Sequence, residues 1–509
     1  MMRSKRNPLI VLACVVLAVG TAIPAAMAQT ASVLRIGIQD DPDLFDPARA
    51  YSFVGRIVLT SLCNKLVDTA PDLSFIPQLV LSWNTAPDGM SVTFKLRPGV
   101  KFSDGTDMDA DAVAFNIERN LTLPTSRRRS EISAVDRVEV VDPLTVRFQL
   151  KTPFAPLVAQ LSDRAGIIAS PKALQNPAGF DVAPACSGPF KMSQRVAQDR
   201  IVLVRDPLYW DRDHYNFDRV EYRVITDPTI RLVNLRTGQL DLAERILAND
   251  LGAIKADPKQ KVIVGPSLQY VGITFNIANG TGMSPDFSKS EALREALSLS
   301  IDRDAINQVV FDGNAVPGNQ PMPPGTRYYA PDRPVPQRDV ARAKALIASS
   351  GTLHPSLTLN LQNNADQTQV GEMIQAMARE VGIDVKLQAL EFQTQLQAQS
   401  SGNFQASLVG WSGRVDPDGN TYTLLGCTSP TNDGRWCAGA EPDLLAGRAE
   451  GDPNKRIGQY QAAFRTIVGA NPIIYLYHPP LIMAMTAKLV GFNYHPDGLM
   501  RLRDVRLGP

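Results

Sequence analysis

The segment 410–420 gathers side chains that could bind a polar solute or take part in catalysis. It follows an apolar run at 404–409, which predicts a β-strand, and its Gly, Pro and Asp residues predict a loop. Indole, hydroxyl, guanidinium and carboxylate groups occur together here, and two carboxylates could also serve as the acid and base of a hydrolase. The candidate residues are Trp411, Ser412, Gly413, Arg414, Asp416 and Asp418.

The periodicity of the C-terminal third places this loop at one edge of a predicted sheet. The pattern predicts, in order, a strand at 357–361, a helix at 370–381, a strand at 383–387, a short helix at 393–399 and a strand at 404–410. Such a βαβαβ order predicts parallel strands with right-handed crossovers. Asn363, Asn364 and the 410–420 loop should then share the carboxyl edge, where open α/β sheets bind ligands.

A second set of candidates lies near the beginning of the chain. Alternating apolar residues at 34–38 predict a strand, an Asp-rich loop follows at 40–47, and a helix is predicted over 51–67. Tyr51 and Phe53 lie just behind the carboxyl end of that strand, so we expect both rings to line the ligand site.

Residues 73–183 predict a separate α+β unit that follows the first strand. Short strands at 92–96 and 100–102 flank an Arg-Pro-Gly turn and predict one hairpin, and strands at 138–141 and 145–150 predict another.

The N-terminus carries the features of a secretory signal peptide. Basic residues precede an apolar stretch at 9–19, and Ala26-Met27-Ala28 forms a small-residue cleavage site. We expect cleavage after Ala28 and export to the periplasm. A membrane anchor and a lipoprotein signal at Cys14 are the alternatives, and the shortness of the apolar stretch disfavours the anchor.

Composition and charge exclude some classes of partner. The 509 residues suggest about three domains, and 52 Lys and Arg nearly balance 51 Asp and Glu. No basic excess favours nucleic acid. The four His residues lack ligand-like spacing and no CxxC pair is present, so we expect neither a metal site nor a cofactor.

Four cysteines remain after the signal peptide: Cys63, Cys186, Cys427 and Cys437. In an oxidising compartment they allow three pairings. We expect Cys427 to pair with Cys437 because they are close in sequence, which leaves Cys63 to pair with Cys186.

Several motifs, in one order along nearly the whole exported chain, resemble those of the family 5 solute-binding proteins. These are the peptide, nickel and opine receptors of ABC importers. The first matches are 77–83 (PQLVLSW), 88–89, 93–105 (TFKLRPGVKFSDG) and 110–113. Further matches are 187–191, 209–210, 232–241, 275–276, 294–303, 382–383, 410–411 and 416–418.

This resemblance implies a fold, a mechanism and further site residues. The fold is α/β, the large three-domain type of the two-lobed periplasmic-binding-protein fold, with a hinge and a cleft between the lobes. The implied parts are a signal peptide at 1–28, a first lobe at 29–72, 184–270 and 480–509, an extra domain at 73–183 and a second lobe at 271–479. Asn276 is a further candidate contact. The receptor would be a monomer that encloses a small solute and delivers it to an inner-membrane permease without catalysis.

Arg414 departs from the pattern of the peptide receptors in this family. They carry an Asp two residues beyond the position of Ser412, and its carboxylate holds the α-ammonium of the peptide. A guanidinium would repel that group and suits a carboxylate or phosphate. We therefore expect a ligand with an anionic or polyhydroxylated group, as in opine- or sugar-conjugate-like solutes, or an acylated peptide, unless Asp416 takes over the role.

Two other classes of function remain as alternatives. A chaperone or signalling receptor of the same fold would bind without feeding a transporter. A secreted hydrolase would use Asp416 and Asp418, but no nucleophile, zinc-protease or phosphate-binding motif accompanies them.

Overall fold

The computed structural model describes residues 32–437 and 439–508, which belong to one compact unit. The predicted signal peptide, its cleavage site at Ala28 and Cys14 lie outside the described residues. Within them, no helix combines the length and the hydropathy that crossing a bilayer requires.

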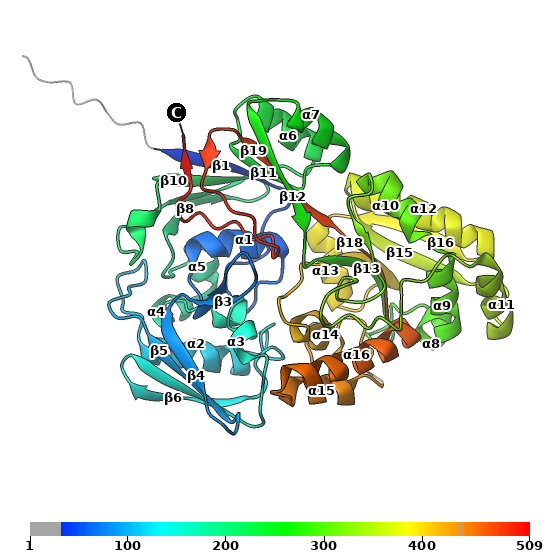
Figure 1. Cartoon of the computed structure of the whole chain (residues 1–509), viewed down its shortest axis with the longest axis horizontal. Helices are drawn as coiled ribbons and strands as arrows, with labels where there is room; N and C mark the ends of the chain where they lie inside the picture. Colours follow the sequence, from blue (N-terminus) through cyan, green and yellow to red (C-terminus); the bar gives the residue numbers. More distant parts are fainter. Residues whose placement is uncertain (1–31, 438, 509) are drawn as a thin grey trace, which may run out of the picture. The chain divides into compact units, whose positions relative to one another are not determined.

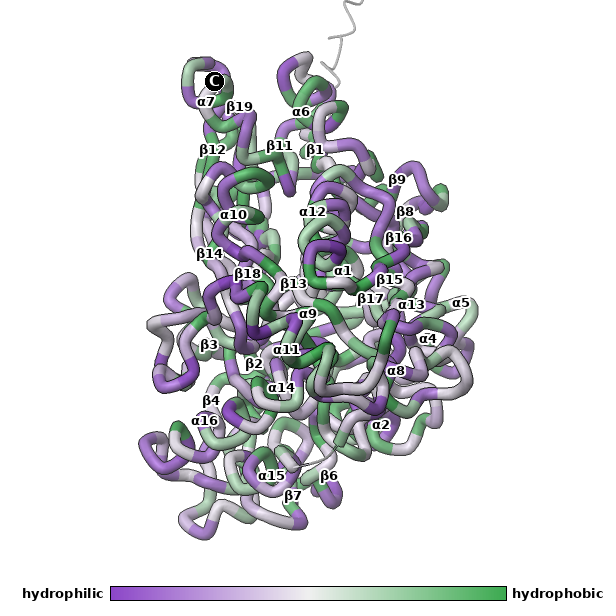
Figure 2. Tube along the Cα trace, turned by 90° about the vertical axis from the view of Figure 1, so that its right-hand side faces the viewer, coloured by the Kyte–Doolittle hydropathy of each residue, from purple (hydrophilic) through white to green (hydrophobic). Residues whose placement is uncertain are grey.

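A seven-stranded sheet forms the centre of the first lobe, which we call the N lobe (Figure 1). Its order is β12-β19-β11-β1-β10-β9-β8, with β1 parallel to both β10 and β11. Its strands are β1 (Val33–Ile38), β8 (Phe190–Val196), β9 (Arg200–Arg205), β10 (Arg219–Val224), β11 (Leu242–Glu244), β12 (Gln260–Pro266) and β19 (Pro480–Thr486). Apolar residues of these strands are buried in the lobe core, and Figure 2 colours the chain by hydropathy.

A six-stranded sheet of order β14-β18-β13-β17-β15-β16 forms the second lobe, the C lobe. Its strands are β13 (Tyr270–Phe275), β14 (Val316–Pro317), β15 (Ser356–Gln362), β16 (Asp384–Leu390), β17 (Ala406–Trp411) and β18 (Ile473–His478). β15 is parallel to both β16 and β17. The predicted parallel βαβαβ unit is therefore confirmed, with β15 in its centre.

A four-stranded antiparallel sheet, β4-β5-β7-β6, packs with the helices α2 (Ala110–Thr122) and α3 (Leu157–Gln160) into a third unit, the insert. Its strands are β4 (Val80–Thr85), β5 (Ser91–Leu96), β6 (Val135–Asp142) and β7 (Thr145–Leu150). The predicted hairpin of β6 and β7 is confirmed. The predicted hairpin of 92–96 with 100–102 is wrong, because residues 100–102 belong to a loop. Strand β5 pairs instead with β7 and with β4, which it follows through the Asp88-Gly89 turn.

The helices cover these sheets and fill the spaces between them (Figure 1). In the N lobe and insert they are α1 (Phe53–Leu62), α2 (Ala110–Thr122), α3 (Leu157–Gln160), η1 (Arg164–Gly166), α4 (Pro171–Leu174), α5 (Pro177–Val182), η2 (Arg212–His214), α6 (Pro228–Arg236), η3 (Ala248–Asp250) and α7 (Leu251–Lys255). In the C lobe they are α8 (Pro285–Lys289), α9 (Glu291–Ser300), α10 (Arg303–Phe311), α11 (Val340–Ser350), α12 (Ala365–Val381), α13 (Phe392–Ser400), α14 (Asp418–Leu425), α15 (Glu441–Ala449) and α16 (Pro453–Ala470). Two short strand pairs, β2 (Val67–Thr69) with β3 (Phe75–Pro77) and β20 (Leu489–Val490) with β21 (Arg506–Leu507), complete the fold.

The chain passes between the two lobes twice, and the two crossings are short. It leaves β12 through residues 267–269 to reach β13, and it returns from β18 to β19 through Pro479. The Ser267 hydroxyl donates a hydrogen bond to the Pro479 carbonyl oxygen at 2.6 Å, which ties the crossings together. Two short, adjacent crossings form a hinge.

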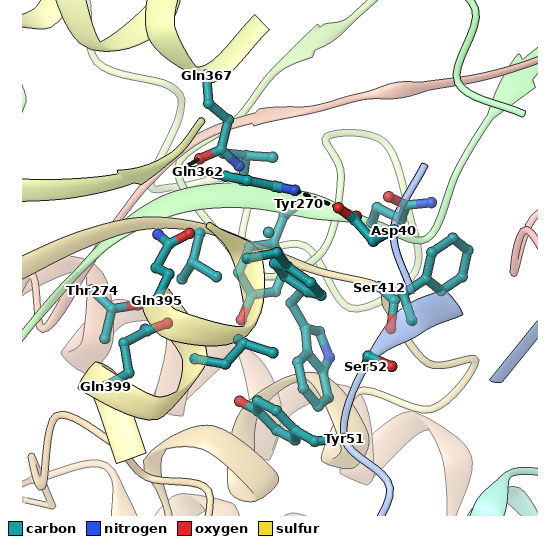
Figure 3. A pocket seen from close by; sticks show the side chains of 18 of the residues that line it. Asp40, Tyr51, Ser52, Tyr270, Thr274, Gln362, Gln367, Gln395, Gln399 and Ser412 are labelled. Carbon is teal, nitrogen blue, oxygen red and sulfur yellow. Dashed lines mark hydrogen bonds between the residues drawn. The ribbon is translucent and has the colours of Figure 1, made fainter. Parts of the chain in front are cut away.

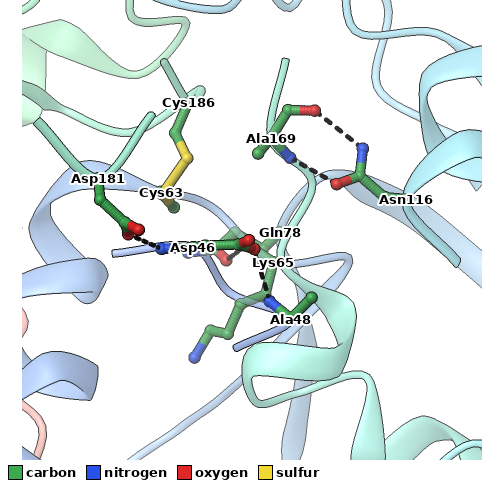
Figure 4. The surroundings of a disulfide bond; sticks show 9 residues. All are labelled: Asp46, Ala48, Cys63, Lys65, Gln78, Asn116, Ala169, Asp181 and Cys186. Carbon is green, nitrogen blue, oxygen red and sulfur yellow. Dashed lines mark hydrogen bonds between the residues drawn. A yellow bond between two sulfur atoms is a disulfide. The ribbon is translucent and has the colours of Figure 1, made fainter. Parts of the chain in front are cut away.

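Helix α1 is shorter than the predicted helix at 51–67. It begins after its N-cap Ser52, whose hydroxyl accepts a hydrogen bond from the backbone N–H of Gly55, and it ends at Leu62, with Cys63 as the C-cap. Cys63 is disulfide-bonded to Cys186 beside the N-lobe core, as expected (Figure 4).

The expected disulfide between Cys427 and Cys437 is wrong for this structure. Both thiols are free and exposed. The Cys427 thiol donates instead to the backbone carbonyl of Cys437 at 3.2 Å.

Candidate solute-binding site

A cavity lies between the N lobe and the C lobe and takes its walls from both. The space not occupied by atoms, counted out into the opening to solvent, is about 1160 Å³. Its lining residues are Gln39, Asp40, Tyr51, Ser52, Phe53, Val54, Arg245, Gln269, Tyr270, Val271, Thr274, Gln362, Gln367, Phe392, Gln395, Leu396, Gln399, Val409, Gly410, Trp411, Ser412, Leu424, Thr431, Asp433 and Ile473.

The topology of both sheets explains why these residues meet. Asp40 follows β1 and Arg245 follows β11, which are parallel neighbours in the N lobe. Gln362 ends β15 and Trp411 ends β17, which are parallel neighbours in the C lobe. The cavity thus lies at the carboxyl ends of parallel strands in each lobe, where such sheets leave a crevice.

A direct hydrogen bond joins the lobes at one side of the cavity (Figure 3). The Gln362 amide donates to the Asp40 carboxylate at 2.8 Å. Burial raises the pKa of Asp40 to about 6, against the opposing field of Arg245. This contact holds a carboxylate of the N lobe against the C lobe.

Aromatic rings and glutamine side chains make up much of the remaining wall. Tyr51, Phe53, Tyr270, Phe392 and Trp411 supply the aromatic surface. Six glutamines line the cavity, and the side-chain oxygen of the buried Gln399 accepts no hydrogen bond from any described residue. Apolar faces with a few amide groups suit a solute that has both apolar and hydrogen-bonding parts.

Trp411 contributes to both the cavity wall and the core. Its side chain is 8% exposed and packs in a C-lobe cluster. The indole N–H donates to the Asn420 side chain at 3.1 Å, and the guanidinium of Arg414 lies 4.7 Å from the ring centroid. These contacts fix the orientation of the ring.

The predicted loop at 410–420 is shorter than expected and covers residues 412–417. β17 continues through Gly410 and Trp411, and α14 begins at Asp418. The antiparallel pairing of β17 with β13 extends the strand beyond its apolar run.

Arg414 does not line the cavity, and its charge is compensated by the protein. Its Nε atom lies 2.7 Å from the Asp163 carboxylate, which also pairs with Arg56 at 2.6 Å. Burial by itself would raise the pKa of Asp163, but Arg414, Arg56 and Arg164 hold it well below the usual range. This position therefore does not support the hypothesis that Arg414 binds an anionic group of the ligand.

Four further candidates also lie outside the cavity lining. Asp416 forms an ion pair with Arg456 at 2.6 Å, and Asp418 forms one with Arg448 at 3.2 Å. The Asn276 amide donates to three backbone carbonyl oxygens. Gly413 has φ +73°, and a Cβ there would lie 2.1 Å from the Leu268 carbonyl oxygen.

Of the candidates predicted from the sequence, Tyr51, Phe53, Trp411 and Ser412 line the cavity. The sequence reasoning missed Asp40, Arg245, Gln362 and Asp433, among others. Asp40 had a usable signal, because it directly follows a predicted strand. Gln362 also ends a strand, one residue before Asn363. Asp433 had none, because the loop between Cys427 and Cys437 follows no predicted strand.

The described residues contain no group of three or more His, Cys, Asp or Glu side chains arranged to hold a metal ion.

Comparison with known proteins gives consistent matches over nearly the whole chain. The glutathione-binding protein GsiB of Pectobacterium atrosepticum is 27% identical, with 91% of each chain covered. The di/tripeptide-binding protein 2 of Pseudomonas aeruginosa is 26% identical, with 96% of this chain and 97% of the relative covered.

Solved structures share the fold. A dipeptide-binding protein from a Pseudoalteromonas species, in complex with Met-Leu, aligns with a TM-score of 0.86 at 22% identity over 93% of this chain and 100% of that one. AgaA of A. tumefaciens, in complex with agropinic acid, aligns with a TM-score of 0.85 at 24% identity over 94% of this chain and 99% of that one. Both match the two lobes described above.

The family model of the bacterial extracellular solute-binding proteins, family 5, matches residues 74–432. This match covers most of the insert and most of the C lobe, including β15, β17 and the cavity residues that follow them. The chain therefore belongs to the family 5 extracellular solute-binding proteins.

Proposed function

We propose that this protein is the periplasmic receptor of an ABC importer and that it captures a peptide or peptide-like solute. The observation that carries this proposal is the cavity, whose walls come from the carboxyl strand ends of two lobes joined by a hinge. A solute that contacts both lobes stabilises the closed form. The closed receptor would then present its cargo to a permease in the inner membrane, as a monomer.

We infer that the protein performs no chemistry on its ligand. The carboxylates considered for hydrolysis, Asp416 and Asp418, are each paired with an arginine and are absent from the cavity lining. Relatives that bind glutathione and di- or tripeptides support a ligand of that size, and the fold shared with AgaA keeps opine-like solutes within the class.

Two measurements test the proposal. Native mass spectrometry of the protein, purified from a periplasmic extract without refolding, should show a co-purified solute of a few hundred daltons. Thermal shift with a panel of di- and tripeptides, glutathione and opines should then find a ligand that raises Tm in a concentration-dependent way. A protein that carries no solute and responds to none of the panel would contradict the proposal.

A further inference from the structure

Asp433 is a buried residue on the cavity wall whose carboxylate has no partner among the described residues. Its side chain is 7% exposed, and it lines the cavity near Thr431. Its carboxylate oxygens accept no hydrogen bond and form no ion pair with any residue in the described ranges 32–437 and 439–508. The backbone carbonyl of Asp433 accepts a hydrogen bond from the Asn279 amide at 2.9 Å, which holds this part of the loop in place.

The surrounding cations do not neutralise this carboxylate directly. Arg127, from the insert, donates to the Pro430 carbonyl at 3.3 Å and lies 5.1 Å from the Tyr51 ring centroid. Arg435, from the same loop as Asp433, donates to the Ser429 carbonyl at 3.4 Å. Neither guanidinium lines the cavity. Burial accordingly raises the pKa of Asp433 to about 6, with Arg127 and Arg435 only opposing that shift.

Asp40 is the other carboxylate in the cavity lining. It differs from Asp433 in its hydrogen bonding and in the charged residues that act on it. It accepts a hydrogen bond from Gln362, and the charges that act on it are those of Arg245, Glu244, Arg231 and Glu391. Neither carboxylate forms an ion pair with a described residue, but Asp40 accepts the Gln362 hydrogen bond, so Asp433 is the less satisfied of the two.

We propose that Asp433 is the anchor for a cationic group of the ligand, an ammonium group in a peptide-like solute. An unpaired carboxylate costs free energy when it is buried, and an ammonium restores the lost interactions through charge-assisted hydrogen bonds. Tyr51 and Trp411 line the same cavity, and the guanidiniums of Arg127 and Arg414 already lie beside their rings. Position 414 carries an arginine, whose charge Asp163 already compensates. The carboxylate proposed to receive the cation therefore comes from a different loop, the one that contains Asp433.

This inference rests on the proposed receptor function and names the ligand chemistry of its site. It assigns the cavity a solute with a free amine and excludes a fully acylated peptide as the preferred ligand. It also replaces the hypothesis that position 414 decides ligand charge.

The test compares each free-amine di- and tripeptide with the same peptide acetylated at every amine, by calorimetry at pH 7.5. Wild-type protein should bind the free-amine form about 10- to 100-fold more tightly, since a charged hydrogen-bond partner is lost on acetylation. In Asp433→Asn this ratio should fall to nearly one. In Asp111→Asn, on the exposed face of α2, the ratio should match that of wild type.

Three results would overturn or separate the two proposals. Equal binding of both peptide forms by wild type, or a ratio that persists in Asp433→Asn, overturns the anchor but leaves a peptide receptor. Binding of cadaverine or glucosamine that Asp433→Asn abolishes, without peptide binding, supports the anchor and contradicts the peptide class. If the wild type binds neither the peptides, free or acetylated, nor the amines cadaverine and glucosamine, both proposals are overturned. The melting curve of Asp433→Asn confirms that the variant is folded.

Discussion

The Arg414 guanidinium and the Asp163 carboxylate lie 2.7 Å apart across the boundary between the C lobe and the insert. Arg56 of the N lobe pairs with the same carboxylate, and the hydroxyl of Ser412 accepts hydrogen bonds from both guanidiniums. One carboxylate therefore holds the three units together. Gln160 of the insert adds a further contact across this boundary by donating to Asp418 at 2.8 Å.

Replacing Asp163 should lower the free energy of unfolding more than replacing Arg414. Asp163→Asn leaves Arg56, Arg164 and Arg414 buried together without their counter-ion, so we expect it to destabilise the protein by about 3–5 kcal/mol. Arg414→Met keeps the pair of Asp163 with Arg56 and should cost about 1–2 kcal/mol. Urea unfolding of both variants at pH 7 measures the difference, and equal losses would contradict the central role of Asp163.

Asp433→Asn should stabilise the ligand-free protein at neutral pH. The pKa of Asp433 is raised to about 6 in the folded protein, against about 3.9 in the unfolded chain. The folded state therefore loses stability as pH rises from about 4 to 6, and the amide removes that loss. We expect a gain of about 1–3 kcal/mol at pH 7. The gain should vanish below pH 4. Denaturant unfolding of both proteins between about pH 4 and 7 measures it, and a gain that stays constant over this range would contradict burial of the charge as its cause.

The affinity for an amine-bearing ligand should fall as the pH drops through 6, because protonation of Asp433 removes the anchoring charge. Asp40, whose pKa is also raised to about 6, titrates in the same range. The other charged and titratable groups that act on Asp433 are Arg127, Arg435 and Tyr51. Calorimetry from pH 5 to 8 on wild type and Asp433→Asn separates the two carboxylates, since only the wild type should lose the part of its affinity that is due to Asp433.

Gly413→Ala should destabilise the connection between β17 and the hinge. The residue has φ +73°, and its new Cβ would lie 2.1 Å from the Leu268 carbonyl oxygen in the first crossing. We expect a loss of about 2–4 kcal/mol from backbone strain and displacement of that crossing. Gly458→Ala in α16 is the control, because no atom lies within 4 Å of a Cβ there and the helix should gain up to about 1 kcal/mol. Thermal unfolding of both variants, with opposite shifts in Tm, checks the prediction.

Removal of the Cys63–Cys186 disulfide should weaken the N lobe. The two residues are separated by 123 positions in sequence, so the cross-link restricts a long loop of the unfolded chain and its loss should cost about 2–5 kcal/mol. The double variant Cys63→Ala and Cys186→Ala, unfolded in guanidinium, measures that loss. A midpoint unchanged from that of the wild type would contradict a structural role for the cross-link.

The sequence determined the parts of this protein that depend on local pattern and order. The 3.6-residue and two-residue periodicities at 357–410 specified a parallel unit, because a helix between two strands leaves few other arrangements. That order also placed Trp411 and Ser412 at the carboxyl edge. The ordered motifs identified the family for the same reason, since they are properties of the chain itself.

The tertiary structure decided which charges face the ligand. Arg414 and Asp433 are both charged loop residues in the sequence, and no local pattern distinguishes them. Asp163 compensates Arg414 from a unit 251 positions earlier in the chain, whereas no described residue pairs with the carboxylate of Asp433. Whether a buried charge is available to a solute depends on contacts between distant segments, because a partner within about 4 Å determines its free energy far more than its neighbours in sequence do.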